Sequence, residues 1–253
     1  MEEELKSMFH VGLLIPSSNR VFENDLHHAL PPPRFWVHSA RMHLRETTVA
    51  AETAMIETFA PAAADQLKAV APDLVVFGCT SAGSLRGMDY DRAVCASLGK
   101  RAGAPCIGVL SAAAAAIRSR RWQRVAVVTP YIDELTTTIV GSLRESGVTV
   151  VTSGGMGISD NIALADPTPE DITAFARTVV GRHHVEGIFV SCTNFRAMEA
   201  MRMIEAELRV PVVTSNFAAV EAVQTFFAER GEDQSGGSTP WLITAFGGTR
   251  WLL

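Results

Sequence analysis

Two cysteines in similar sequence contexts are the residues of this chain best suited to chemistry. Cys79 stands near the end of segment 73–81 (DLVVFGCTS), and Cys192 near the end of segment 186–194 (EGIFVSCTN). In each segment, an apolar run typical of a buried strand stops at Cys-Thr and a small polar residue. A thiol placed there can attack carbon or transfer a proton. Cys79 and Cys192 are therefore the predicted catalytic residues.

The spacing of these segments indicates an internal duplication. The two cysteines lie 192 − 79 = 113 positions apart. Segment 11–16 (VGLLIP) resembles segment 125–130 (VAVVTP), with their prolines 130 − 16 = 114 positions apart. Segment 105–111 resembles segment 211–215 at an offset of 211 − 105 = 106. Three matching segments at similar offsets predict two similar lobes, each presenting one thiol to a shared cleft.

Strand-like and helix-like segments alternate along the chain. The predicted strands are 11–15, 35–41, 74–77, 106–110, 125–128, 148–152, 188–190 and 212–214. The predicted helices are 21–30, 48–70, 90–101, 111–120, 134–145, 169–182, 198–208 and 218–229. Such alternation is typical of right-handed βαβ units that build a parallel sheet.

The alternation and the repeat together predict an α/β fold with two pseudo-symmetric lobes. Each lobe is expected to be a doubly wound parallel sheet flanked by helices, with the active site in the cleft between them. We expect an N-terminal lobe over 1–120 and a C-terminal lobe over 121–230. This division allows C-terminal helices to cross over between the lobes. The glycine-rich segment 154–169 is predicted as a long loop, and 231–253 as a tail with no assigned docking site.

Composition argues against several classes of function. The net charge of −5 and the absence of a basic run argue against nucleic acid or an anionic membrane as partner. The chain contains no apolar run of about 18 residues, and its acidic start lacks the features of a signal peptide. Four cysteines without CxxC spacing favour a reduced, cytoplasmic protein. The absence of HExxH, Walker and GxGxxG patterns gives no support for a metal, nucleotide or dinucleotide, so we expect no cofactor.

Polar turns follow four of the predicted strands, where ligands of parallel sheets are bound. Each cysteine is expected just before the start of a helix, whose N–H groups stabilise a thiolate or a substrate carboxylate. Two thiols among neutral donors, without lysine or an acidic pair, suit chemistry that stabilises an enediolate-like charge. The four turns are 16–19 (PSSN), 79–81 (CTS), 130–131 (PY) and 192–194 (CTN).

The ordered set of turns resembles the cofactor-independent aspartate/glutamate racemase superfamily. PSSN at 16–19, GCTS at 78–81, TPY at 129–131 and SCTN at 191–194 are similar to its branch of maleate cis-trans isomerases, arylmalonate decarboxylases and ectoine-utilisation proteins. GISDN at 157–161, followed by Pro169-Glu170, also resembles that branch. The similarity covers about residues 10 to 230.

This resemblance implies a role for each matching residue. Cys79 matches the first-lobe cysteine, the nucleophile or first base, and Cys192 the second-lobe cysteine, which handles a proton on the opposite face. Decarboxylases of the group resemble the pattern with a single cysteine in the second lobe, so Cys79 argues against simple decarboxylation. The implied substrate-binding residues are Asn19, Tyr131 and Asn161, which match carboxylate ligands, and Thr80, Ser81 and Thr193, which match the donor turns.

The resulting interpretation is a cofactor-free isomerase of a small carboxylate, most simply one that converts maleate to fumarate. Racemisation of an amino acid or hydantoin, arylmalonate-type decarboxylation, and carboxylate binding without catalysis remain alternatives. The long apolar segment 106–117 favours a homo-oligomer.

Several of the candidate residues also have ordinary structural interpretations. Asn19 is equally suited to cap a helix, Tyr131 to fill the core, and Asn161 to stand in a loop. Cys95 and Cys106 are predicted core residues. The pairs His27-His28 and His183-His184 are predicted at solvated helix ends, because adjacent helical residues do not share a face.

Overall fold

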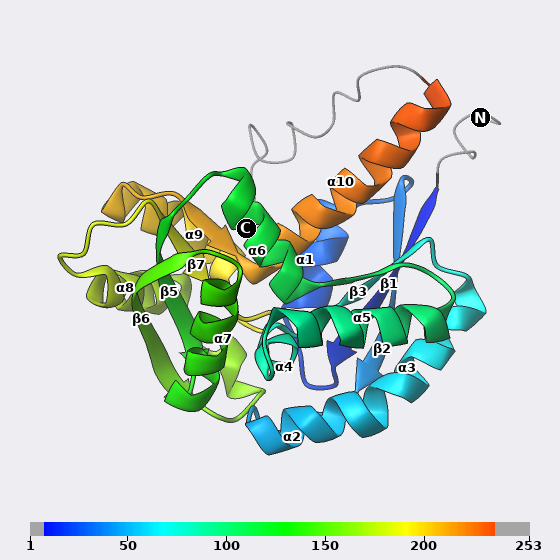
Figure 1. Cartoon of the computed structure of the whole chain (residues 1–253), viewed down its shortest axis with the longest axis horizontal. Helices are drawn as coiled ribbons and strands as arrows, with labels where there is room; N and C mark the ends of the chain where they lie inside the picture. Colours follow the sequence, from blue (N-terminus) through cyan, green and yellow to red (C-terminus); the bar gives the residue numbers. More distant parts are fainter. Residues whose placement is uncertain (1–7, 236–253) are drawn as a thin grey trace.

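The computed structural model describes residues 8–235 and contains two parallel four-stranded sheets. The N-terminal sheet has the order β2-β1-β3-β4 and the C-terminal sheet the order β6-β5-β7-β8, so the same topology occurs twice. This arrangement confirms the predicted α/β fold and its repeat (Figure 1). The strands are β1 Phe9–Pro16, β2 Phe35–Met42, β3 Leu74–Phe77, β4 Cys106–Gly108, β5 Arg124–Tyr131, β6 Thr149–Ile158, β7 Gly187–Val190 and β8 Val212–Thr214.

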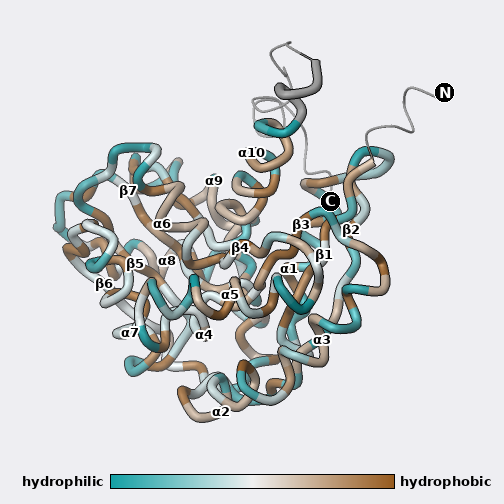
Figure 2. Tube along the Cα trace, turned by 45° about the vertical axis from the view of Figure 1, so that its right-hand side comes forward, coloured by the Kyte–Doolittle hydropathy of each residue, from teal (hydrophilic) through white to brown (hydrophobic). Residues whose placement is uncertain are grey.

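Helices connect the strands and flank both sheets. They are α1 Phe22–Ala29, α2 Val49–Ala54, α3 Ala60–Leu67, α4 Thr80–Ser84, α5 Met88–Ala102, α6 Val109–Ser119, α7 Asp133–Glu145, α8 Pro169–Val180, α9 Ala197–Leu208 and α10 Ser215–Ser235. Apolar positions run mainly along the strands and polar ones along the outer loops (Figure 2). The central strands β3 and β7 are buried along their whole length, as expected of parallel strands covered on both faces.

Two helices pack on the lobe opposite to the strand that they follow. Helix α6 follows β4 of the N-terminal sheet, yet its Leu110 and Ile117 belong to the core cluster of the C-terminal lobe. Helix α10 follows β8 of the C-terminal sheet, yet its Val220 and Phe227 pack with β1 in the N-terminal lobe. The two crossing helices also contact one another (Figure 1). The reciprocal exchange therefore joins the lobes through buried apolar surface.

Strand β6 corrects the prediction of a loop that begins at residue 154. The strand continues through the glycines to Ile158, pairing Gly154 with Val128 and Gly155 with Thr129. A Cβ atom at Gly155 would lie 2.2 Å from the carbonyl oxygen of Tyr131, so only glycine permits this approach. Glycines that read as loop residues in the sequence thus serve close strand packing.

The predicted helix 48–70 is present but not uniform. A π-helical turn, Met55–Phe59, separates α2 from α3, and Pro61 follows directly at the start of α3. The irregular turn accommodates a proline that lacks the N–H of a regular helix. Near the other end of the chain, α10 starts earlier and ends later than predicted, and the rest of the predicted tail, 236–253, lies outside the described residues.

Candidate active site

The candidate site lies where the carboxyl ends of β1, β3, β5 and β7 face each other across the two lobes. Cys79 follows β3 and Cys192 follows β7, while Tyr131 is the last residue of β5. These side chains retain 4 %, 2 % and 2 % of their exposure, so the groups that could react are enclosed. In such surroundings, the few polar contacts of each group decide its protonation.

Cys79 occupies the N-terminal end of the short helix α4. Gly78 precedes it because a Cβ there would lie 2.9 Å from the carbonyl oxygen of Leu14. The sulfur accepts a hydrogen bond from the N–H of Ala82, and the hydroxyl of Ser81 lies 3.8 Å away. Burial nevertheless raises the pKa of Cys79 well above its ordinary value, and the charge of a nearby carboxylate adds to this effect.

Cys192 has a different local structure, which corrects the expectation of a helix start after each cysteine. A turn follows it, and α9 begins only at Ala197. Cys192 adopts φ 137°, a region that costs a residue other than glycine about 1–3 kcal/mol. Its N–H donates to Ser215 Oγ at 3.1 Å, and its sulfur accepts from the N–H of Asn194 at 3.2 Å.

Tyr131 provides a second donor to the sulfur of Cys192. Burial raises the pKa of Cys192 to about 12, whereas the hydrogen bonds from the Tyr131 hydroxyl and the Asn194 N–H act in the opposite direction. Burial also raises the pKa of Tyr131 well above its ordinary value, with further contributions from Cys192, Cys79 and Glu52. The phenol therefore stays protonated and can donate.

The two threonines that follow the cysteines join the lobes. Thr80 donates to Ser215 Oγ at 2.9 Å, and Thr193 donates to the carbonyl oxygen of Gly78 at 3.0 Å. The side-chain amide of Asn19 in turn donates to Thr193 Oγ1 at 3.0 Å. The hydroxyl protons of Thr80 and Thr193 are thus used within the protein, although the sequence predicted both residues as substrate donors.

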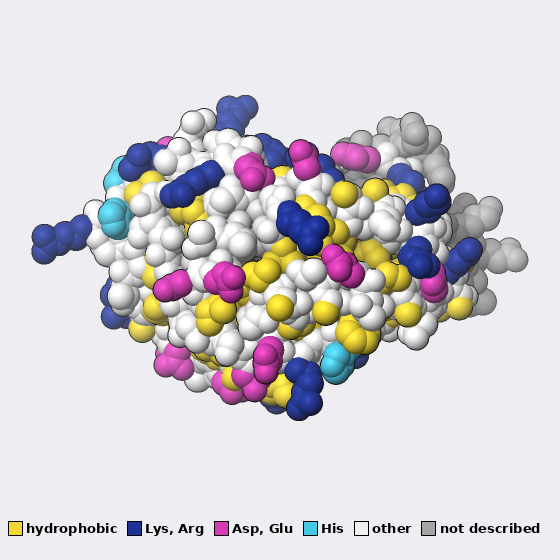
Figure 3. Space-filling model, turned by 60° about the horizontal axis from the view of Figure 1, so that its bottom comes forward, with side chains coloured by type: hydrophobic (Ala, Val, Ile, Leu, Met, Phe, Trp, Pro, Cys, Tyr) yellow, Lys and Arg dark blue, Asp and Glu magenta, His cyan; other side chains and the backbone are white. Residues whose placement is uncertain are grey.

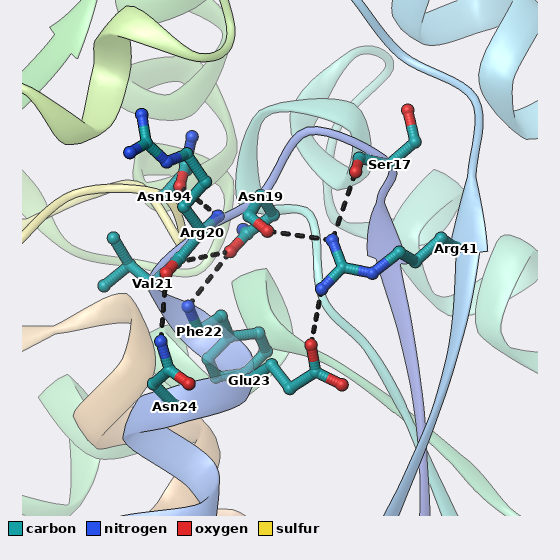
Figure 4. Close-up of polar contacts among 9 residues, drawn as sticks. All are labelled: Ser17, Asn19, Arg20, Val21, Phe22, Glu23, Asn24, Arg41 and Asn194. Carbon is teal, nitrogen blue, oxygen red and sulfur yellow. Dashed lines mark hydrogen bonds and ion pairs between the residues drawn. The ribbon is translucent and has the colours of Figure 1, made fainter.

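Asn19 connects the start of α1 to the other lobe. Its Oδ1 accepts hydrogen bonds from the N–H groups of Val21 and Phe22 at 3.1 and 3.0 Å, ahead of α1 (Figure 4). Its amide group meanwhile reaches Thr193 in the other lobe. One Asn19 N–H remains after that bond, because a primary amide has two.

Asn161 lies in the segment between β6 and α8 and connects it to the N-terminal lobe. Its amide donates to Ser18 Oγ at 2.6 Å, and its Oδ1 accepts from Thr47 Oγ1 at 3.1 Å. Its carbonyl oxygen accepts from the side chain of Asn194 at 2.5 Å. Asn161 is 3 % exposed, so the segment closes over the turn at residues 17–19.

The guanidinium group of Arg41, beside the turn at residues 17–19, is bonded to groups of the protein itself. The guanidinium of Arg41 donates to the carbonyl oxygens of Ser17 and Asn19 at 3.1 and 2.9 Å and pairs with Glu23 (Figure 4). A surface cavity of about 470 Å³ adjoins this turn and is lined in part by Arg20 and Arg41. Phe22, three positions after Asn19, is fully buried in the core of the N-terminal lobe.

Sequence reasoning missed two polar residues of the site. Ser215 accepts the hydrogen bonds from Thr80 and Cys192. Glu52, on α2, is 0 % exposed and accepts a hydrogen bond from the hydroxyl of Ser81. Burial raises the pKa of Glu52 to about 8. One signal in the sequence could have revealed Glu52. It lies three residues before Met55 and four before Ile56, so this charged residue falls on the apolar stripe of its helix.

The other two thiols contact each other. Cys95 packs in the core of the N-terminal lobe, where its hydrogen bond with Cys106 and its burial raise its pKa. Within residues 8–235, no cluster of three or more His, Cys, Asp and Glu is arranged to hold a metal ion. Across the same residues, no helix is long and apolar enough to cross a membrane. On the face in Figure 3, acidic and basic side chains are interspersed.

Fold and site together define a two-lobed α/β protein with paired thiols in an enclosed polar site between its sheets. Residues 11–238 match the family model of arylmalonate decarboxylase. The chain belongs to this family, which confirms the resemblance seen in the sequence.

Similar proteins of the family include enzymes with two different names. The maleate isomerase of Pseudomonas putida is 27% identical over 234 residues, covering 87% of this chain and 92% of that protein. The arylmalonate decarboxylase of Bordetella bronchiseptica is 27% identical over 138 residues, 54% of this chain and 58% of that protein. A Cys-to-Ala variant of a Pseudomonas putida maleate isomerase, crystallised with maleate, superposes with a TM-score of 0.81 at 28% identity, covering 87% and 92% of the two chains.

Proposed function

We propose that this protein is a cofactor-independent isomerase that converts a small cis-enedioate, of which maleate is the simplest, into its trans isomer. The observation that carries the proposal is the presence of two buried cysteines at corresponding places of the two lobes, in one enclosed site. Similarity to maleate isomerases over most of the chain supports the choice of substrate class.

The proposed reaction starts with the thiolate of Cys79 adding to one carbon of the double bond. The π electrons move to the neighbouring carbon, where the adjacent carboxylate stabilises them as an enediolate-like charge. The central bond is now single and rotates. Expulsion of the Cys79 thiolate restores the double bond in the trans geometry, so no atom is gained or lost overall.

Cys192 is proposed to handle the proton on the opposite side. Protonation of the enediolate carbon by Cys192 gives a succinyl thioether, and return of that proton to Cys192 precedes expulsion of the Cys79 thiolate. A Cys-to-Ser variant of the Nocardia farcinica maleate cis-trans isomerase holds a covalently bound succinylcysteine intermediate, and that enzyme shares this fold with a TM-score of 0.80 at 22% identity. Such an adduct is the species that this sequence of steps requires.

Substrate binding is proposed to use the neutral donors around the thiols. Tyr131 is a protonated donor beside Cys192, and the free amide N–H of Asn19 is a second donor. The first turn of α4 supplies N–H groups that lack partners within the helix. Asn161 and the turns that contain Thr80, Ser81 and Thr193 complete the proposed set of substrate-binding residues. In Thr80, Ser81 and Thr193 the proposed donors are backbone N–H groups, because the three hydroxyls donate within the protein.

Proton NMR in deuterated water tests this function. Purified protein is incubated with maleate and, in parallel, with racemisable amino acids, hydantoins and an arylmalonate. We expect fumarate to form without added cofactor, and to be lost in Cys79→Ser and Cys192→Ser but retained in Cys106→Ser, the control thiol outside the site. Deuterium at an α-carbon would instead identify a racemase, release of carbon dioxide a decarboxylase, and binding of maleate without turnover a carboxylate-binding protein.

Assembly and location are proposed on separate grounds. A cavity of about 420 Å³ between α6 and α10 is lined by five alanines, Ile107 and Phe226, with five polar residues that include Glu221 and Glu229. Its apolar part supports a homo-oligomer that buries this groove. Light scattering of the purified protein tests this point. All four cysteines are free thiols, which supports a reducing, cytoplasmic location.

A further inference from the structure

The proposed reaction requires Cys79 to lose a proton, and the immediate surroundings of this thiol oppose that loss. Burial raises the pKa of Cys79, and the hydrogen bond from the Ala82 N–H counteracts it only in part. The groups that act on this pKa are Glu52, Ala82, Ser81 and Cys192, and none of them is a cation. A buried thiol without a neighbouring cation needs a base if it is to become a nucleophile.

Glu52 is the group placed to act as that base. Its side chain is fully buried, and its Oε1 accepts a hydrogen bond from the hydroxyl of Ser81. Its Oε2 has no hydrogen-bond partner among the described residues. A carboxyl group left half-satisfied in a protein interior is costly unless the site makes use of it. The hydroxyl of Ser81 lies between this carboxyl group and the thiol, with Oγ 3.8 Å from Cys79 Sγ.

We propose that Glu52 accepts the proton of Cys79 through the hydroxyl of Ser81 when the sulfur attacks the substrate. The thiol proton moves to Ser81 Oγ while the hydroxyl proton moves to Glu52 Oε1. The sulfur electron pair forms the new C–S bond, and Glu52 becomes a neutral acid. Expulsion of the thiolate at the end of the reaction reverses both transfers. This role rests on the proposed function, because it assumes that Cys79 is the nucleophile.

The surroundings of Glu52 adapt it to this exchange. An ordinary carboxylate is a poor acceptor of a thiol proton because its pKa is several units lower, and burial makes Glu52 a stronger base by raising its pKa to about 8. The titratable groups that feel its charge are Cys79, Cys192 and Tyr131, and the charge raises the pKa of each. Protonating Glu52 removes that repulsion at the moment when the negative charge passes to the substrate.

The position of Glu52 is fixed by contacts across the two lobes. Thr48 caps the start of α2 by accepting from the N–H of Ala51 at 3.3 Å. Just before it, the Thr47 N–H donates to the carbonyl oxygen of Ser159 at 2.7 Å, and its hydroxyl donates to Asn161. The next glutamate, Glu57, is instead exposed and pairs with Arg86 at the surface, so it provides a matched control.

The test compares Glu52→Gln, Ser81→Ala and Glu57→Gln with the wild-type protein. Glutamine keeps the shape of Glu52 and can accept the Ser81 hydrogen bond, but it cannot take a proton. Two rates are measured at pH 8.5, where a carboxyl group with a pKa of about 8 is mostly ionised: turnover of maleate, and alkylation of Cys79 by iodoacetate, a small carboxylate electrophile, followed by peptide mass mapping. Thermal unfolding verifies that each variant is folded.

The relay predicts that both Glu52→Gln and Ser81→Ala lower kcat by at least about 100-fold, the usual contribution of a general base, while KM changes little. Alkylation of Cys79 should slow in the same two variants, and Glu57→Gln should match the wild type in both rates. If Glu52 acted only through its charge, Glu52→Gln would lower the pKa of Cys79 and alkylation would become faster.

The outcomes separate this inference from the proposed function. Unchanged or faster alkylation in Glu52→Gln, or no alkylation of Cys79 in the wild type, would overturn the relay even if maleate is isomerised. Failure of the wild-type protein to convert maleate, together with alkylation that depends on Glu52 and Ser81, would reject the proposed substrate and keep the relay.

Discussion

The two cysteine turns differ in structure although their sequences, GCTS and SCTN, are nearly the same. Cys79 lies in extended backbone with φ −141° and leads directly into α4. Cys192 lies at φ 137° and leads into a turn that delays α9. The sulfur of Cys79 accepts from one backbone N–H and lies 3.8 Å from the hydroxyl of Ser81, which is bonded to the carboxyl group of Glu52. The sulfur of Cys192 instead receives hydrogen bonds from a phenol and a backbone N–H.

This difference teaches that a duplicated fold need not contain duplicated chemistry. The N-terminal half provides a thiol next to groups that can accept its proton, as a nucleophile needs. The C-terminal half provides a thiol held among donors, with a pKa of about 12, which suits a group that carries a proton and then takes it back. The predictions below test this division of labour, from the largest expected effect to the smallest.

Removing either thiol should have the largest effect. Cys79→Ser should abolish turnover, because serine in this buried position is far less nucleophilic than a thiolate. Cys192→Ser should reduce kcat by roughly 10³-fold, as expected when a proton carrier is lost. Steady-state kinetics with maleate measures both. Wild-type activity in either variant would contradict a two-thiol mechanism.

Replacing Tyr131 by Phe should lower kcat less than loss of a thiol does, and it should affect Cys192 but not Cys79. The change removes the phenol that donates to Cys192 and leaves the contacts of Cys79 with Ser81 and Glu52 in place. We expect kcat to fall about 100-fold, the usual effect of losing one positioned donor. Alkylation of Cys79 by iodoacetate should stay within about twofold of the wild type, and a parallel loss in both assays would show that the halves are not independent.

The stability of the N-terminal half should depend on pH through Glu52. Its pKa is raised from 4.5 to about 8 in the folded protein, so the folded state binds this proton more tightly than the unfolded state. The associated stability is fully present below pH 4.5 and is lost as the pH rises through 8. The unfolding free energy of Glu52→Gln relative to wild type should therefore increase from pH 5 to about pH 8 and level off above it, measured by urea titration. A difference that does not vary with pH would mean that Glu52 is not buried as described.

The smallest effects are expected from the threonines that join the lobes. Thr193→Val removes the hydroxyl that contacts both Gly78 and Asn19, whereas Thr80→Val removes one bond to Ser215. Buried polar groups left unpaired cost about 1–3 kcal/mol. Both variants should be destabilised within this range, Thr193→Val more than Thr80→Val, as measured by urea unfolding at pH 7. Equal unfolding free energies of the two variants would show that the hydroxyls of Thr193 and Thr80 contribute equally to the contact between the lobes.

The sequence predicted the fold because its signals are local. Continuous apolar runs marked β3 and β7, and the similar offsets between matching segments marked the repeat. The same runs indicated Cys79 and Cys192, because parallel strands place the residues that follow them at one edge of the sheet.

The parts that were missed depend on contacts between distant segments. Glu52 reaches Ser81 across 29 positions, and Ser215 reaches Thr80 across 135, so neither partner is visible in a local pattern. The turn after Cys192 resembles a helix start in its residue types, and the positive φ of Cys192 leaves no mark in its sequence. The glycines within β6 resemble a loop in the sequence. The need for glycine at position 155 comes from the carbonyl oxygen of Tyr131, which belongs to the neighbouring strand β5.

The most direct test of the division of labour is to locate the covalent adduct formed with maleate. Cys192→Ser and Cys79→Ser are each incubated with maleate, and intact mass and peptide mapping identify the modified residue. The account predicts a succinyl adduct on Cys79 in Cys192→Ser, because the nucleophile remains, water slowly supplies the proton, and the group that removes this proton again is gone. It predicts no adduct in Cys79→Ser. An adduct on Cys192 in Cys79→Ser, with none on Cys79 in the other variant, would contradict the assignment.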